Sequence, residues 1–115
     1  MRDIPCPCCG FLTISGEYGS YSICPVCDWE DDPVQLANPT SGGGANKQSL
    51  AEAQALALVK FPSTLNLALG HRRASAWRPL MASELVAADA RRTNKHWSAK
   101  AVLLESEAYW SNGGA

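Results

Sequence analysis

The placement of the cysteines constrains this chain more than any other feature. All five cysteines of the 115 residues lie between residues 6 and 27. They include two matching turns, Cys6-Pro7-Cys8-Cys9 and Cys24-Pro25-Val26-Cys27, with fourteen residues between Cys9 and Cys24. Two Cys-x-x-Cys pairs at this separation are typical of a four-cysteine metal site. We therefore predict that one metal ion is bound by Cys6, Cys9, Cys24 and Cys27.

The residues around the two pairs suit tight metal-binding turns. A proline after the first cysteine fixes φ and reduces the chain entropy lost on folding. Gly10 and Asp28 follow the second cysteine of each pair, where a left-handed backbone is often required. Cys8 occupies the variable position that Val26 occupies in the second turn. We predict that Cys8 is a small buried apolar residue, with a reactive thiol as the alternative.

Four cysteine ligands predict a structural role for the ion, because a catalytic zinc keeps an open coordination position. We expect structural Zn²⁺. Iron is an alternative, since four thiolates also suit a rubredoxin-like electron carrier. Thiol–disulfide exchange is a third interpretation, but no thioredoxin-like βαβ pattern surrounds the pairs.

The segment between the pairs predicts a β-hairpin. Residues 11–14 and 21–23 are short β-prone runs, and the turn-rich sequence SGEYGS separates them. We predict a zinc-ribbon-like hairpin that the ion stabilises, because an isolated hairpin is marginal in water.

Three helices are predicted after the cysteines. Ser49 and Glu52 form a capping-box pattern, which predicts a helix over residues 50–60 that ends before Pro62. Its apolar face is expected to contain Leu50, Ala53, Leu56 or Ala57, and Val59 or Lys60. Residues 80–92 are predicted to form a second helix, which begins directly after Pro79. Ser98 is expected to cap a third over residues 99–110, which Asn112-Gly113 ends. Residues 63–79 fit either a strand or a helical turn.

These elements predict an α+β protein in which the hairpin packs with about three α-helices. We expect residues 1–62 to form the cysteine-rich domain with one helix. Residues 63–115 are expected to form a helical extension that packs on it as one unit.

Charge is unevenly distributed along the chain. The first 46 residues hold one cation and six acids (net −5), and the remainder holds nine cations and five acids (net +4).

The segment DWEDD follows the second cysteine pair, and tryptophan is enriched at binding hot spots. We predict a partner-binding surface at Trp29, Glu30, Asp31 and Asp32. The alternative is a solvated acidic loop with Trp29 packed over the metal turn.

The basic residues allow a second type of partner. Seven cations lie near Trp77 and Trp97 in the sequence and are suited to phosphate contacts. They are Arg72, Arg73, Arg78, Arg91, Arg92, Lys95 and Lys100. The same residues are equally suited to ion pairs with the acidic first part, and the overall charge of −1 argues against a general nucleic-acid binder. His71 and His96 are expected to be ordinary surface or boundary residues.

Three stretches carry a resemblance to a known family. CPCCG, CPVCDWEDD and GGANKQSLAEA resemble the bacterial cysteine-rich CPCC family over residues 4–60. The resemblance implies a small cysteine-rich, metal-binding domain without an assigned biochemical activity. Some members resemble components of toxin–antidote loci.

These observations lead to one main functional hypothesis. No catalytic constellation stands out, so we expect a non-enzymatic protein-binding module, most specifically an immunity protein that binds and neutralises a bacterial toxin. A nucleic-acid-associated zinc ribbon and the iron electron carrier are the alternatives. The chain has no signal-peptide pattern and no run of about 18 apolar residues. We therefore expect a cytoplasmic protein that does not enter a membrane. In the cytoplasm, clustered cysteines serve as metal ligands rather than as disulfides.

Overall fold

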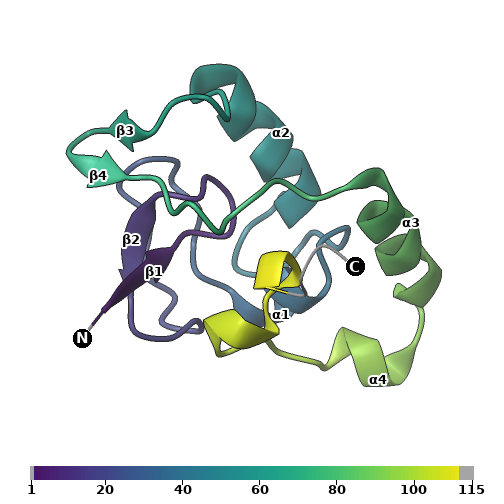
Figure 1. The fold of residues 1–115 in the computed structure, drawn as a ribbon. Coiled ribbons are helices and arrows are strands. Elements are labelled where there is room, and N and C mark those ends of the chain that lie inside the picture. Colours follow the sequence, from purple (N-terminus) through teal and green to yellow (C-terminus); the bar gives the residue numbers. More distant parts are fainter. Residues whose placement is uncertain (1, 112–115) are drawn as a thin grey trace.

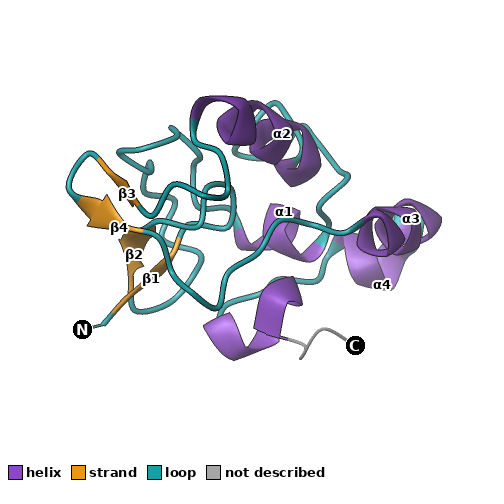
Figure 2. Ribbon diagram, turned by 45° about the horizontal axis from the view of Figure 1, so that its top comes forward, coloured by secondary structure: helices purple, strands orange, loops and turns teal. Residues whose placement is uncertain are grey.

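The computed structural model describes residues 2–111, which form an α+β fold. Figures 1 and 2 show four short strands at one end of the molecule and two helices, α3 and α4, at the other. The strands are β1 (Asp3–Pro5), β2 (Leu12–Ser15), β3 (Leu67–Ala68) and β4 (His71–Arg72). The helices are α1 (Pro33–Ala37), α2 (Leu50–Lys60), α3 (Ala82–Arg91) and α4 (Lys95–Ser98). Two 3₁₀ turns follow, at Glu105–Glu107 and Tyr109–Ser111.

The first hairpin differs from the expected pairing. Strand β2 pairs with β1, which precedes it, in an antiparallel arrangement with a bulge between Ile4 and Pro5. Residues 21–23 do not pair with β2. Tyr21 has a φ of 57°, which is unsuited to a strand, and Ile23 instead forms an isolated bridge with Glu30. The chain therefore folds back on itself at each cysteine pair, through residues 6–11 and 24–29, rather than across residues 15–20.

The predicted helix over residues 50–60 is confirmed with both of its boundaries. Ser49 accepts a hydrogen bond from the Glu52 amide, and the Glu52 carboxylate accepts one from the Ser49 amide. The buried face contains Leu50 and Ala57, as expected, together with Gln54. Leu56 and Val59 are exposed, so the alternative in which they belong to that face is wrong.

The C-terminal helices are shorter than predicted. Helix α3 occupies most of residues 80–92, but the helix expected over residues 99–110 does not form, and Asn94 rather than Ser98 caps a helix here. The amide of Val102 donates to the Pro33 carbonyl, and the Leu103 carbonyl accepts from the Tyr18 amide. These long-range bonds hold the backbone extended, which overrides its helical propensity. The expected stop at Asn112-Gly113 lies outside the described residues.

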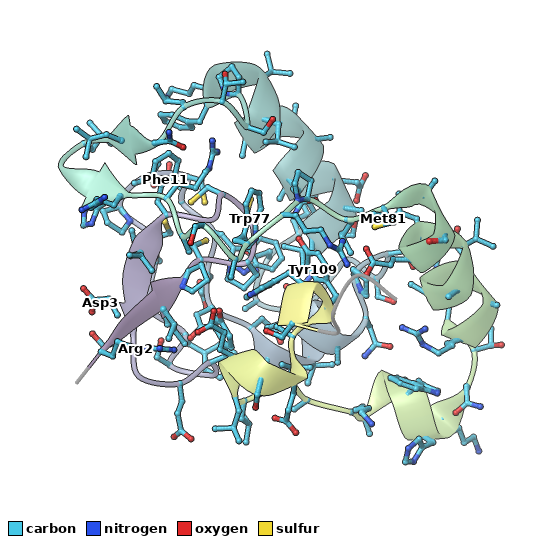
Figure 3. All side chains as sticks on the ribbon, in the orientation of Figure 1. Arg2, Asp3, Phe11, Trp77, Met81 and Tyr109 are labelled. Atoms are coloured by element: carbon cyan, nitrogen blue, oxygen red, sulfur yellow. The ribbon has the colours of Figure 1, made fainter. Side chains whose placement is uncertain are left out.

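Residues 63–79, which the sequence left open, form the small β3–β4 hairpin and an extended segment. The segment crosses the first cysteine turn, since Arg73 bridges Phe11 and the Ala74 amide donates to the Gly10 carbonyl. Figure 3 shows Phe11, Trp77 and Tyr109 through the middle of the molecule. The hydrophobic core combines residues from both the cysteine-rich part and the C-terminal part.

None of the helices described in residues 2–111 has the length and apolar content needed to cross a membrane.

Candidate metal centre

The two cysteine turns have the same backbone geometry. In the first, the Cys6 amide donates to the Phe11 carbonyl and the Gly10 amide donates to the Cys6 carbonyl, both at 2.8 Å. In the second, the Cys24 amide donates to the Trp29 carbonyl at 2.8 Å and the Asp28 amide donates to the Cys24 carbonyl at 2.9 Å. Gly10 and Asp28 have φ values of 80° and 67°, so the left-handed backbone expected after each pair is present. Each turn thus presents its two thiols in the same way.

The turns bring the four predicted thiols together. The Sγ atoms of Cys6, Cys9, Cys24 and Cys27 all lie within 4.8 Å of one another. The closest approaches are 3.6 Å between Cys6 and Cys27 and 3.7 Å between Cys9 and Cys24. A tetrahedral site with Zn–S bonds of about 2.3 Å has sulfur–sulfur distances of about 3.8 Å. The cluster therefore has the size and composition to hold one metal ion.

Burial and close contact shift the pKa values of the clustered thiols. Burial and the neighbouring thiols raise the pKa of the Cys6 thiol well above its ordinary value. The pKa of Cys24 is lowered, first by its interaction with the neighbouring Cys27 thiol, and Thr13 Oγ1 lies 3.2 Å from the same sulfur. The thiol of Cys6 thus resists ionisation more than that of Cys24. Metal binding would displace the remaining protons, and lower pH would weaken it.

Arg73 fastens the first turn to the C-terminal part. Its guanidinium donates hydrogen bonds to the carbonyls of Cys9, Phe61, Pro62 and Leu65. Its Cζ lies 4.3 Å from the centroid of the Phe11 ring. Burial lowers the pKa of Arg73, and its electrostatic interaction with Cys9 opposes that shift. Arg73 therefore places a positive charge near the thiols and also joins the first turn to the end of α2.

Cys8 is separate from this cluster. It is 1% exposed and lies in the hydrophobic core, as predicted for a small buried residue.

The acidic segment after the second turn does not form the expected exposed surface. Trp29, Asp31 and Asp32 are buried, and only Glu30 is half-exposed. Asp32 caps α1 through the amides of Val34 and Gln35, and its other oxygen accepts from the Ala45 amide. The prediction of a partner-binding surface at Trp29, Glu30, Asp31 and Asp32 is therefore corrected: these side chains build the interior beside the metal centre.

Asp31 provides a direct check of this structural role. Its Oδ2 accepts hydrogen bonds from the amides of Gly19 and Ser20 and from the Ser20 hydroxyl. We expect Asp31→Ala to lower the free energy of unfolding by about 2–4 kcal/mol, because it leaves these donors without their charged acceptor. Urea denaturation of the metal-loaded protein measures the loss. Glu17→Ala, at an exposed position, should change stability by less than about 0.5 kcal/mol. Equal stability of the two variants would contradict the structural role.

Two buried glutamines were missed by sequence reasoning. Gln54 Nε2 donates to the Pro7 carbonyl and the Tyr109 hydroxyl, while its Oε1 accepts from the Leu80 amide. Gln35 Nε2 donates to three carbonyls of the glycine-rich loop, at Ser41, Asn46 and Gln48. Glutamine on a short or amphipathic helix is usually exposed, so the sequence holds no signal for either role.

The basic residues are partly used inside the fold. Arg73 contacts carbonyls, as described above, and Arg78 forms a two-point ion pair with Glu84 at 2.8 and 3.0 Å. Neither pairs with the acidic first part. His71 is half-exposed and His96 is exposed, as expected for surface or boundary residues.

A comparison with protein families decides which family this is. The profile of the family described as cysteine-rich CPCC matches residues 4–61, just over half of the chain. The chain belongs to the cysteine-rich CPCC family. A comparison with curated proteins gave no match. The CPCC segment contains the four clustered thiols, strand β1 apart from Asp3, strand β2, and helices α1 and α2. It ends where Arg73 contacts the end of α2, so the remaining residues complete the surroundings of the CPCC turns.

Proposed function

We propose that Cys6, Cys9, Cys24 and Cys27 bind one Zn²⁺ as thiolates and that the ion has a structural role. The observation that carries this proposal is the approach of four thiols to within 4.8 Å at the tips of two matching turns. Four thiolates complete a tetrahedral shell, which suits a structural rather than a catalytic ion. The two turns and the ion would together form a zinc-ribbon-like unit in a non-enzymatic protein.

Metal analysis tests this proposal. Protein purified without added metal should contain about one zinc per chain and should be colourless. One iron per chain, with visible charge-transfer bands, would instead identify a rubredoxin-like electron carrier. The absence of both metals would remove the proposed metal centre. We further propose that the protein resides in a reducing compartment such as the cytoplasm, where clustered cysteines serve as metal ligands rather than as disulfides.

We further propose that the protein binds a protein partner through α2 and the β3 turn. Four large apolar side chains are exposed there, with exposed fractions of 59–82%. They are Leu56, Val59, Leu67 and Leu69. Contiguous exposed apolar patches mark interaction sites, and we propose that these four side chains form one. This surface replaces the acidic segment as the proposed contact.

Paired substitutions test the binding surface. The tagged protein should retain a specific partner from its source cells, and Val59→Glu should abolish that capture. Val86→Glu on α3 is the matched control, because Val86 is also an exposed valine on a helix. The proposal fails if both variants retain the partner equally.

The most specific form of this proposal is an immunity protein that neutralises a bacterial toxin. Its support is the resemblance to toxin–antidote components. Co-expression with the product of the adjacent gene tests it. We expect a stable complex and protection of the host cell from that product. An adjacent product that is harmless, together with no complex, would exclude the toxin as partner and leave the metal centre unaffected.

Nucleic acid is the alternative partner. Its affinity would fall steeply with salt, because binding releases counterions from phosphates. Negligible binding to duplex DNA or RNA at low salt would remove this alternative.

A further inference from the structure

A cavity lies between the C-terminal helices and α1, away from the metal centre. Its volume is about 370 Å³, within the range of small-molecule sites. Side chains from α1, α3, α4 and the 3₁₀ turns line it. Its apolar wall includes Leu36, Pro39, Leu80 and Val102. The wall therefore suits a ligand with an apolar body.

The charged side chains of the cavity are unbalanced. Glu84 is paired with Arg78, and Glu107 accepts a hydrogen bond from the Leu104 amide. Arg91 and Lys100 also line the cavity, and no ion pair within residues 2–111 involves either of them. Glu107 offsets one of these two charges, so the cavity keeps an excess of one positive charge, and neither Arg91 nor Lys100 forms an ion pair with a carboxylate of the described residues.

Trp97 holds these two cations near each other. The Arg91 Cζ lies 4.2 Å from the Trp97 ring centroid, and the Lys100 Nζ lies 4.6 Å from it. Cation–π contacts attract each cation to the ring, but they leave its charge in place. The Asn38 side chain donates to the Trp97 carbonyl at 2.7 Å, which ties α4 to α1. The pair of cations is therefore held by the fold.

A second observation indicates a missing acceptor. Arg91 Nε is buried and has no hydrogen-bond partner among the described residues. Buried donors are nearly always paired, and an unpaired one costs free energy. A carboxylate bound beside Arg91 would offer its guanidinium an acceptor and would balance the excess of one positive charge in the cavity.

We propose that this cavity binds a small carboxylate with an apolar body. The carboxylate contacts Arg91 and Lys100 beside Trp97, and the body lies against Leu36 and Val102. This site does not depend on the proposed protein partner or on the identity of the metal.

Two probes of nearly equal shape test the proposal with the metal-loaded full chain. They are 2-naphthoate and 2-naphthamide, which differ in charge at the carbonyl group. Titrations followed by ¹H–¹⁵N spectra should show naphthoate binding about tenfold tighter than the amide, because its hydrogen bonds are to a charged group. Shifts should concentrate at Ala87, Trp97 and Ala101, which line the cavity.

Substitutions of Arg91 and Lys100 test whether these cations bind the carboxylate. Arg91→Met and Lys100→Met should each weaken naphthoate binding severalfold or more and leave amide binding unchanged. Arg92→Met is the matched control, because Arg92 is an exposed neighbour that pairs with Asp89 at 3.8 Å and does not line the cavity. Lys100 is exposed, so its variant remains informative if Arg91→Met fails to fold. Equal binding of the two probes, shifts outside the cavity, no binding at millimolar naphthoate, or an equal loss in the Arg92 variant would each overturn the proposal.

Discussion

Cys6→Ser is expected to release the metal ion and to remove the cooperative unfolding transition of the protein. Cys6 is fully buried in the cluster, and its backbone closes the first turn through Phe11 and Gly10. Structural zinc contributes on the order of 10–16 kcal/mol of apparent binding free energy in finger peptides, which exceeds the total stability of most small domains. Zinc content and circular dichroism during urea denaturation measure the two effects. Addition of a strong chelator to the unmodified protein should have the same result.

Cys8→Ser is the matched control for this experiment. It introduces the same hydroxyl two residues away, in a side chain that is also buried but lies outside the four-thiol cluster. The variant should keep one metal ion per chain and lose only about 1–3 kcal/mol of stability, from burying a hydroxyl group. Loss of metal from Cys8→Ser as readily as from Cys6→Ser would show that the ligand assignment is wrong.

Gly10→Ala is expected to have the second largest effect, a loss of about 3 kcal/mol or more in the free energy of unfolding. Two causes act together at this position. The φ of 80° is strained for any residue with a Cβ, and that Cβ would lie 2.3 Å from Cε3 of Trp77. Trp77 cannot move easily, because its Nε1 donates to the Pro7 carbonyl inside the same turn. The substitution therefore separates the first turn from the C-terminal part.

Gly43→Ala isolates the contribution of the Trp77 contact. Gly43 has the same φ of 80°, but a Cβ there would meet nothing within 4 Å. It should cost only the backbone strain, about 1–2 kcal/mol. Thermal or urea denaturation of both variants gives the difference. If the two losses are equal, the contact between Gly10 and Trp77 contributes nothing to stability.

The features that could be predicted from the sequence are those determined by residues close together along the chain. The two cysteine turns follow from their spacing, their prolines, and the residues Gly10 and Asp28. Helix α2 follows from the Ser49–Glu52 capping box and from Pro62. In each case the signal lies within a few residues of the structure that it specifies.

The features that were missed depend on contacts between distant residues. Residues 99–104 have helical propensity, but backbone bonds to Tyr18 and Pro33 hold them extended. The segment DWEDD is acidic enough to suggest a surface, yet the glycine-rich loop covers it. Asn46 bonds both the amide and the carbonyl of Glu30, and the Ala45 amide bonds Asp32. No local pattern indicates that a loop 13 to 16 residues away will contact Glu30 and cover Asp32.

The four hydrogen bonds of Arg73 show that the family match and the folded unit end at different places in this chain. The family profile stops at residue 61, but the first cysteine turn is finished by residues beyond it. A fragment that ended there would leave the Cys9 carbonyl without Arg73 and would uncover Phe11 and the Pro7 carbonyl, which Arg73 and Trp77 now contact. A relative with a different C-terminal part therefore needs another way to cover this turn. The natural unit for expression, engineering and comparison therefore includes the C-terminal residues that complete the core, rather than only the stretch that defines the family.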